Sequence, residues 1–190
     1  MTADELHLAV NSGRLSKLQI TGLVAILEQA PDLVGDLLKE IKAQDKEDTF
    51  NASWTFDHLM RKKLVYLLPF MDDFSQVLTE LKDQSSIRPM AHVCQMLCET
   101  YFKHKDPIFV KNISQNHLEA IMTCCFDWFI GEHKVAAKVF SMRTLFYLGG
   151  KFDWVHPELK MILEATISEG TSGYKNSAKK TLDKLAKLGH

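Results

Sequence analysis

The sequence predicts an all-α fold built from stacked helix pairs, and three observations support that class. Apolar residues recur at helical spacing along most of the chain, capping signals precede several of these runs, and the runs repeat about every 40 residues. The alternating patterns and Asn-Gly or Asp-Gly pairs of β-hairpins are absent from the sequence. With 46% apolar residues, a chain of 190 residues can bury a sizeable core. We therefore expect a single domain over residues 1–190.

The first helices are predicted by their start signals. Thr2 with Glu5, and Ser16 with Gln19, have the spacing of capping boxes, in which two side chains satisfy the free amides of a first turn. Pro31 suits the first position of a helix because the N–H that proline lacks would have no partner there. We expect a short helix near residues 3–12, followed by a first helix pair.

An internal repeat extends this pattern through the rest of the chain. A stripe of apolar residues at offsets 0, 3, 4 and 7 begins at Val34, Phe74, Leu118 and Leu159. A second series of helical runs lies between these stripes and centres on Ala52, Ala91, Ala137 and Ala178. One helix pair cannot cover its own apolar face, so neighbouring pairs are expected to stack.

Each repeat is therefore expected to contain an A helix and a B helix. The predicted pairs are 16–29 with 31–43, 48–65 with 71–83, 86–103 with 114–130, and 134–149 with 156–168. A final helix over 174–188 carries five lysines, as suits a solvated terminal cap. The longer connection over 103–113 is apolar and bears lysines, so it either binds a partner or folds back over the core.

Two interleaved helical series that each recur at about 40 residues resemble HEAT and armadillo repeat proteins. The resemblance covers nearly the whole chain. It implies a right-handed α-α superhelix of about four HEAT-like helix pairs plus a terminal capping helix. Such arrays hold protein or peptide partners on a concave face that the B helices line.

Residues 86–91, 126–138 and 152–160 also resemble an uncharacterised family of small bacterial helical proteins, whose members are often labelled adenylosuccinate lyase. The true lyases carry a Gly-Ser-Ser-x-Met-Pro-x-Lys-x-Asn loop. The nearest stretch here, residues 170–176, lacks the Met-Pro pair and has compressed spacing. It reads as a turn that begins the last helix.

Charge and cysteine content bear on location and partners. The net charge of −1 gives no global basic field, although residues 1–85 hold 9 Lys+Arg and 14 Asp+Glu while residues 86–190 hold 14 and 10. No apolar run approaches the roughly 18–20 residues of a membrane span. The acidic N-terminus does not look like a secretion signal, and the cysteines are not spaced as an extracellular disulfide framework. These features predict a cytoplasmic protein with no membrane contact.

The residues that could carry chemistry form no complete motif. Cys94, Cys98, Cys124 and Cys125 fall on two helices expected to be neighbours, but no Cys-x-x-Cys hook accompanies them, so we expect buried thiols rather than a zinc site. The eight histidines include no His-x-x-x-His pair, and no glycine-rich phosphate loop or Gly-x-Ser-x-Gly elbow is present. We expect no metal, no cofactor and no catalytic residue.

The leading functional hypothesis is a non-catalytic protein–protein interaction or scaffold module. If B helices line the concave face, the outward residues Asp36, Glu40, Glu80, Glu119 and Lys160 are expected to contact a protein or peptide partner. Their acidic balance disfavours nucleic acid, because a duplex-binding groove needs the opposite charge, but the basic C-terminal cap leaves that partner open.

A second hypothesis is a HEAT-like DNA-binding protein. The fold resembles that of alkylpurine DNA glycosylases, in which tryptophans and an aspartate could stabilise a cationic lesion. The candidate residues are Asp127, Trp128, Asp153 and Trp154, although tryptophans in helical arrays also pack between repeats. An adenylosuccinate lyase-like activity is the third hypothesis.

Overall fold

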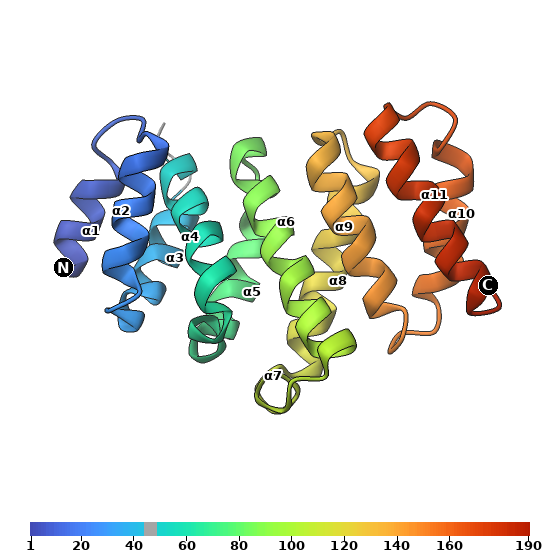
Figure 1. Ribbon diagram of the computed structural model, residues 1–190, viewed down its shortest axis with the longest axis horizontal. Coiled ribbons are helices and arrows are strands. Elements are labelled where there is room, and N and C mark those ends of the chain that lie inside the picture. The colour runs from blue at the N-terminus through green and yellow to red at the C-terminus, as the bar shows by residue number, and fades with distance from the viewer. Residues whose placement is uncertain (44–48) are drawn as a thin grey trace.

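A computed structural model describes residues 1–43 and 49–190 (Figure 1), and within those ranges every regular element is a helix. The predicted all-α class is therefore confirmed for the part of the chain that the structure describes. None of the helices there combines the length and the apolar character that crossing a membrane requires.

The helices form two layers, and the chain alternates between them. The A layer contains α2 (Lys17–Leu27), α4 (Thr49–Lys63), α6 (Gln84–Cys98), α9 (Val135–Leu148) and α11 (Ser172–Lys187), each in contact with the next. The B layer contains α1 (Ala3–Val10), α3 (Val34–Lys42), α5 (Met71–Glu80), α8 (Gln115–Ile130) and α10 (Val155–Thr166). Figure 1 shows the A layer as a row of neighbouring helices, with the helices α3, α5, α8 and α10 behind it.

The core lies where the two layers meet. The four predicted stripes begin at residues that are all at most 1% exposed, and so are the four alanines of the second series. Across the layers, α3 packs on α4 and α8 packs on α9, while α10 contacts both α9 and α11. The repeat found in the sequence therefore marks the residues that join the layers, as a buried stripe should.

The helix boundaries follow the predictions with local differences. Pro31 begins a 3₁₀ turn, Pro31–Leu33, ahead of α3 rather than the first turn of α3 itself. A second 3₁₀ segment, Leu64–Phe70, connects α4 to α5 and was not predicted, because its shorter period does not follow helical spacing. The predicted start of α4 at residue 48 lies outside the described residues.

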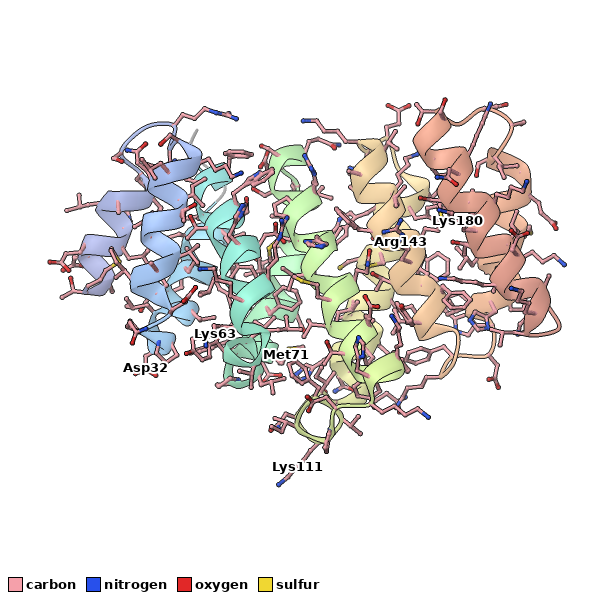
Figure 2. The ribbon with its side chains drawn as sticks, viewed as in Figure 1. Asp32, Lys63, Met71, Lys111, Arg143 and Lys180 are labelled. Carbon is pink, nitrogen blue, oxygen red and sulfur yellow. The ribbon has the colours of Figure 1, made fainter. Side chains whose placement is uncertain are left out.

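The connection after α6 folds back and is also partly exposed. The helix continues as a π-helical turn, Glu99–His104, and Lys105 then adopts a left-handed conformation. A short helix follows, α7 (Pro107–Asn112), capped by Asp106. Phe109 of α7 is buried, whereas Lys111 is exposed, and Figure 2 shows its side chain pointing away from the rest of the molecule.

Side-chain caps fix the starts of several helices. The capping boxes of Thr2 with Glu5 and of Ser16 with Gln19 are both present, as predicted. The cap of α6 was not predicted. Asp83 accepts hydrogen bonds from the backbone N–H of Ser85 and Ser86, and from the Ser86 hydroxyl at 2.7 Å. One carboxylate therefore satisfies two amides of the first turn.

We expect the substitution Asp83→Ala to lower the free energy of unfolding by about 1 kcal/mol at neutral pH, the usual cost of losing an N-cap. Burial acts to raise the pKa of Asp83, but the hydrogen bonds from Ser86 and Ser85 outweigh it and hold the pKa below its ordinary value. A lowered folded-state pKa means that the charged cap stabilises the fold above about pH 4, and that this contribution is lost as the pH falls through the folded-state pKa.

Urea denaturation of the wild type and Asp83→Ala at neutral and acidic pH checks this prediction. The difference in the free energy of unfolding between the wild type and Asp83→Ala should become smaller at acidic pH. Asp83→Asn is the matched control, because asparagine caps helices well but carries no charge. A wild-type to Asp83→Ala difference that is the same at both pH values would contradict it.

Candidate functional site

The acidic residues expected to contact a partner lie on the B layer and already have intramolecular partners. Asp36 accepts an ion-pair hydrogen bond from Lys39 at 2.7 Å. Glu40 lies 2.8 Å from His7 Nδ1 and from Asn11 Nδ2, so it attaches α1 to α3. Both carboxylates therefore stabilise contacts within the B layer.

The other three members of this set are similarly placed. Glu80 lies 3.2 Å from Lys42 Nζ of the preceding B helix, and Glu119 accepts a hydrogen bond from Gln115 at 2.8 Å. Lys160 is 4.0 Å from Glu164 one turn later. The structure brings these side chains to one layer, but none of the grooves described below includes them.

The residues of the DNA-binding hypothesis fall into two environments. Trp128 is 4% exposed and belongs to the core. Trp154 is 53% exposed and stacks on Phe126, with ring centroids 5.2 Å apart. Asp127 and Asp153 are exposed, and Asp127 lines a groove beside Trp128. Among the described contacts, none joins the Asp127–Trp128 pair to the Asp153–Trp154 pair.

The four cysteines are buried. Burial raises the pKa of Cys124 to about 12 and also raises the pKa of Cys94 and Cys98. Because the thiolate is the form that attacks a substrate, the thiols of Cys94, Cys98 and Cys124 are poor nucleophiles near neutral pH. Across residues 1–43 and 49–190, no group of three or more His, Cys, Asp or Glu residues is arranged to hold a metal ion.

The stretch compared with the lyase loop is a helix start. Thr171 caps α11 by accepting a hydrogen bond from the backbone N–H of Tyr174, as the interpretation of a turn before the last helix predicted. In the ranges that the structure describes, no Ser, Thr or Cys side chain is hydrogen-bonded to a histidine ring, the pairing that activates such nucleophiles.

The layer opposite the predicted partner surface also contains grooves. We call the outer surface of α2, α4, α6, α9 and α11 the A face. It contains two grooves of about 430 and 450 Å³, one near each end of the layer. Both grooves are lined by several lysines and arginines, so the A face has the charge that the B-layer set lacks.

The N-terminal groove, of about 430 Å³, combines cations with aromatic rings. Its polar and aromatic lining is Arg14, Lys17, Phe50, Trp54, His58, Arg61 and Arg88, with no acidic side chain in the described wall. These residues come from the loop before α2, from α2, from α4 and from α6. The groove therefore depends on the packing of three consecutive A-layer helices, which contact one another as α2 on α4 and α4 on α6.

Two arginines lie over aromatic rings in this groove. The Arg14 guanidinium carbon is 4.4 Å from the Phe50 ring centroid, and that of Arg88 is 5.2 Å from the Trp54 ring. The Phe50 and Trp54 centroids are 5.2 Å apart, so the two cation–π pairs adjoin. His58 Nδ1 lies 2.9 Å from the Trp54 carbonyl oxygen, which fixes the imidazole beside the indole.

A buried carboxylate supports the wall of the groove. Asp57, which is 2% exposed, lies 2.5 Å from Arg61 Nη2 and 2.6 Å from His92 Nδ1. The first contact holds Arg61 at the groove, and the second joins α4 to α6. Because an unpaired buried charge is costly, these two contacts stabilise the Asp57 carboxylate inside the protein.

The C-terminal groove, of about 450 Å³, lies between α6, α9 and α11. Its cations are Lys103, Arg143, Lys180, Lys184 and Lys187, and its acids are Glu99 and Asp183. Figure 2 labels Arg143 on α9 and Lys180 on the neighbouring helix α11. The hydrogen bond from Lys103 lowers the pKa of Glu99, so this acid is ionised and neutralises one of the five cations near neutral pH.

Helical periodicity placed the candidate partner surface on the B helices and did not indicate the A-face grooves. A signal was present: the basic residues of the A helices recur on their exposed positions, as at Arg61, Arg88 and Arg143. Comparison with protein-family models, with curated proteins and with solved structures found no match.

Proposed function

We propose that this protein is a non-catalytic interaction module, a HEAT-like right-handed α-α superhelix whose A face holds an anionic segment of a partner macromolecule. The observation that carries the proposal is the pair of cationic grooves on one layer. Arg14, Lys17, Arg88, Arg143 and Lys180 are exposed, and within the described residues none of them forms an ion pair.

The repeat architecture supports this type of function. Helix pairs that stack about every 40 residues produce an extended surface, on which side chains from successive helices act together. Both grooves illustrate this, because each is lined by three consecutive helices or their flanking segments. A partner that is extended along the layer would contact both grooves at once.

The small free energy of each exposed ion pair means that a partner must be held by several contacts together. A solvent-exposed ion pair contributes roughly 0.2–1 kcal/mol, so no single cation can hold a partner. Several contacts together can do so, and their sum must weaken with added salt because exposed charges are screened beyond about 10 Å at 0.1 M. The B-layer acids are a poorer candidate surface, since Asp36, Glu40 and Glu80 are engaged with neighbouring side chains.

The proposal predicts that reversing charges on the A face removes the partner. We expect the triple variant Arg88→Glu, Arg143→Glu, Lys180→Glu to capture at least tenfold less partner than the wild type, because its affinity should fall at least tenfold, or by about 1.4 kcal/mol or more. The measurement is a tagged pull-down from native cell extract at low salt, with and without nuclease, quantified by mass spectrometry and nucleic-acid staining.

Two further variants make the result specific. Lys39→Glu, Lys111→Glu, Lys160→Glu changes the net charge by the same amount at residues that line neither groove, and we expect it to retain the partner. The variant Asp36→Lys, Glu119→Lys tests the B-layer surface predicted from the sequence. The A-face proposal would be contradicted if the two triple variants lost partner binding equally. It would also be contradicted if only the Asp36→Lys, Glu119→Lys variant lost the partner.

A further inference from the structure

We propose that the partner bound in the N-terminal groove is single-stranded nucleic acid, with its bases stacked on the ring–guanidinium wall and its phosphates paired with the cations at the rim. This inference rests on the proposed function, because it assigns a chemical class to the anionic partner of the A face. It concerns the groove around Phe50, Trp54, Arg14 and Arg88.

The arrangement of the wall carries the inference. Arg14 lies over Phe50 and Arg88 lies over Trp54, so two flat cationic groups are held against two adjacent rings. Nucleobases stack on aromatic side chains and on guanidinium planes, and each stacked base contributes about 1–3 kcal/mol in single-stranded complexes. The same arginines can also pair with the phosphates on either side of a stacked base.

The alternative anionic partners use less of this wall. An acidic peptide would pair with the cations but leave the rings without a stacking partner. In a duplex the faces of the bases are covered by their neighbours, so the rings could be used only after a base had been turned out of the stack, at a cost of a few kcal/mol. Bases in a single strand are already accessible, and a groove of about 430 Å³ is within the size range of small-molecule sites.

The indole of Trp54 provides an independent observation. Its Nε1 is enclosed and has no hydrogen-bond acceptor among the described residues, although buried donors are nearly always paired. Base carbonyls, ring nitrogens and phosphates are all acceptors. A nucleotide stacked on this wall would bring such an acceptor beside the indole that contains this donor.

The test measures fluorescence polarisation of labelled oligonucleotides at low salt. The probes are a thymidine strand of about 15 nucleotides, near the upper site size of single-strand binding folds, and an abasic strand with the same number of phosphates. A duplex of equal length and a glutamate-rich peptide complete the set. We expect the thymidine strand to bind at least tenfold more tightly than the abasic strand, because one stacked base is enough to give that factor.

Variants of exposed and half-exposed residues locate the binding. Arg88→Gln and Phe50→Leu should each weaken binding of the thymidine strand by about tenfold, the effect of losing one stacked base. Lys63→Gln, an exposed cation that lines neither groove, is the matched control and should change binding less than threefold, as expected for one screened surface charge. Quenching of tryptophan fluorescence by the strand should be lost in Trp54→Phe. Circular dichroism verifies that each variant is folded.

The outcomes separate this inference from the proposed function. Equal affinity for thymidine and abasic strands would show that stacking is absent and would overturn the inference, while leaving an anion-binding A face intact. Preferential binding of the glutamate-rich peptide would also overturn the inference while leaving an anion-binding A face intact, and it would indicate that the partner is an acidic protein segment. If no probe binds and the A-face charge reversals retain the partner from cell extract, both proposals fail.

Discussion

The substitution Gly149→Ala is expected to lower the free energy of unfolding by about 3 kcal/mol, near the upper end of the usual cost of overpacking. Gly149 follows α9 and is buried, and a Cβ atom placed there would overlap the His156 ring at Cδ2 and Nε2. The backbone of Gly149 has φ −60°, which any residue adopts. The requirement for glycine is therefore one of space and not of conformation.

The His156 ring has little freedom to move away from an added methyl group. It is 5% exposed, and its Nε2 donates a hydrogen bond to the Phe146 carbonyl oxygen at 2.8 Å. The ring also lies 5.6 Å from the Phe146 ring and 4.8 Å from that of His190. Moving it would break the hydrogen bond, worth about 1 kcal/mol, and would strain the junction of α9 with α10 by a further 1–3 kcal/mol.

Chemical denaturation of the wild type and Gly149→Ala measures this effect directly, and the melting temperature should fall by roughly 2–4 °C per kcal/mol. Gly22→Ala is the matched control, because a Cβ at that position in α2 meets no atom within 4 Å. It should raise stability by about 0.5–1 kcal/mol through better helix propensity. An unchanged or raised stability of Gly149→Ala would contradict the steric argument.

A second variant identifies His156 as the obstructing group. His156→Ala removes the ring, so adding Gly149→Ala to it should cost far less than adding Gly149→Ala to the wild type. Residues in direct contact are expected to deviate from additivity by 0.5–3 kcal/mol, and here the deviation should be favourable to the double variant. Full additivity would indicate that the methyl group clashes with something else.

The helices were predictable because the residues that join the layers recur with the period of a helix. Val34, Phe74, Leu118 and Leu159 are each buried, and each begins a B-layer stripe that the pattern placed correctly. Segments without that period were missed. The 3₁₀ segment Leu64–Phe70 has a different repeat, and α7 is too short to show one.

The candidate site was not predictable by the same means, because its residues meet only through tertiary packing. Arg14 and Phe50 are far apart in sequence, and Trp54 meets Arg88 only because α4 packs beside α6. Helical spacing shows which residues share a face, but it does not show which layer of a two-layer array presents its charges to a partner. The B-layer prediction came from analogy with HEAT-like repeat proteins, whereas the A-face grooves follow from the contacts between helices.

Asp57 links the packing of α4 on α6 to the N-terminal groove, because it contacts both His92 and Arg61. We expect Asp57→Ala to lower the free energy of unfolding by about 2–3 kcal/mol, because it removes hydrogen bonds to two charged or chargeable groups. The cost stays below that of stranding a fully buried ion, since Arg61 and His92 are 47% and 20% exposed and can turn to water. Binding in the N-terminal groove should weaken as well, because Arg61 loses the carboxylate that positions it.

A double-mutant cycle of Asp57→Ala with His92→Ala measures the bridge between α4 and α6, and we expect a coupling energy of at least about 1 kcal/mol. The exposed pair Lys160–Glu164, 4.0 Å apart, is the matched comparison and should couple by less than about 0.5 kcal/mol. Added salt should reduce the second coupling and leave the first nearly unchanged, because Asp57 is shielded from solvent ions. Equal salt sensitivity of the two pairs would show that the Asp57 carboxylate is open to water. In that case it could not be the fixed support on which the geometry of the groove depends.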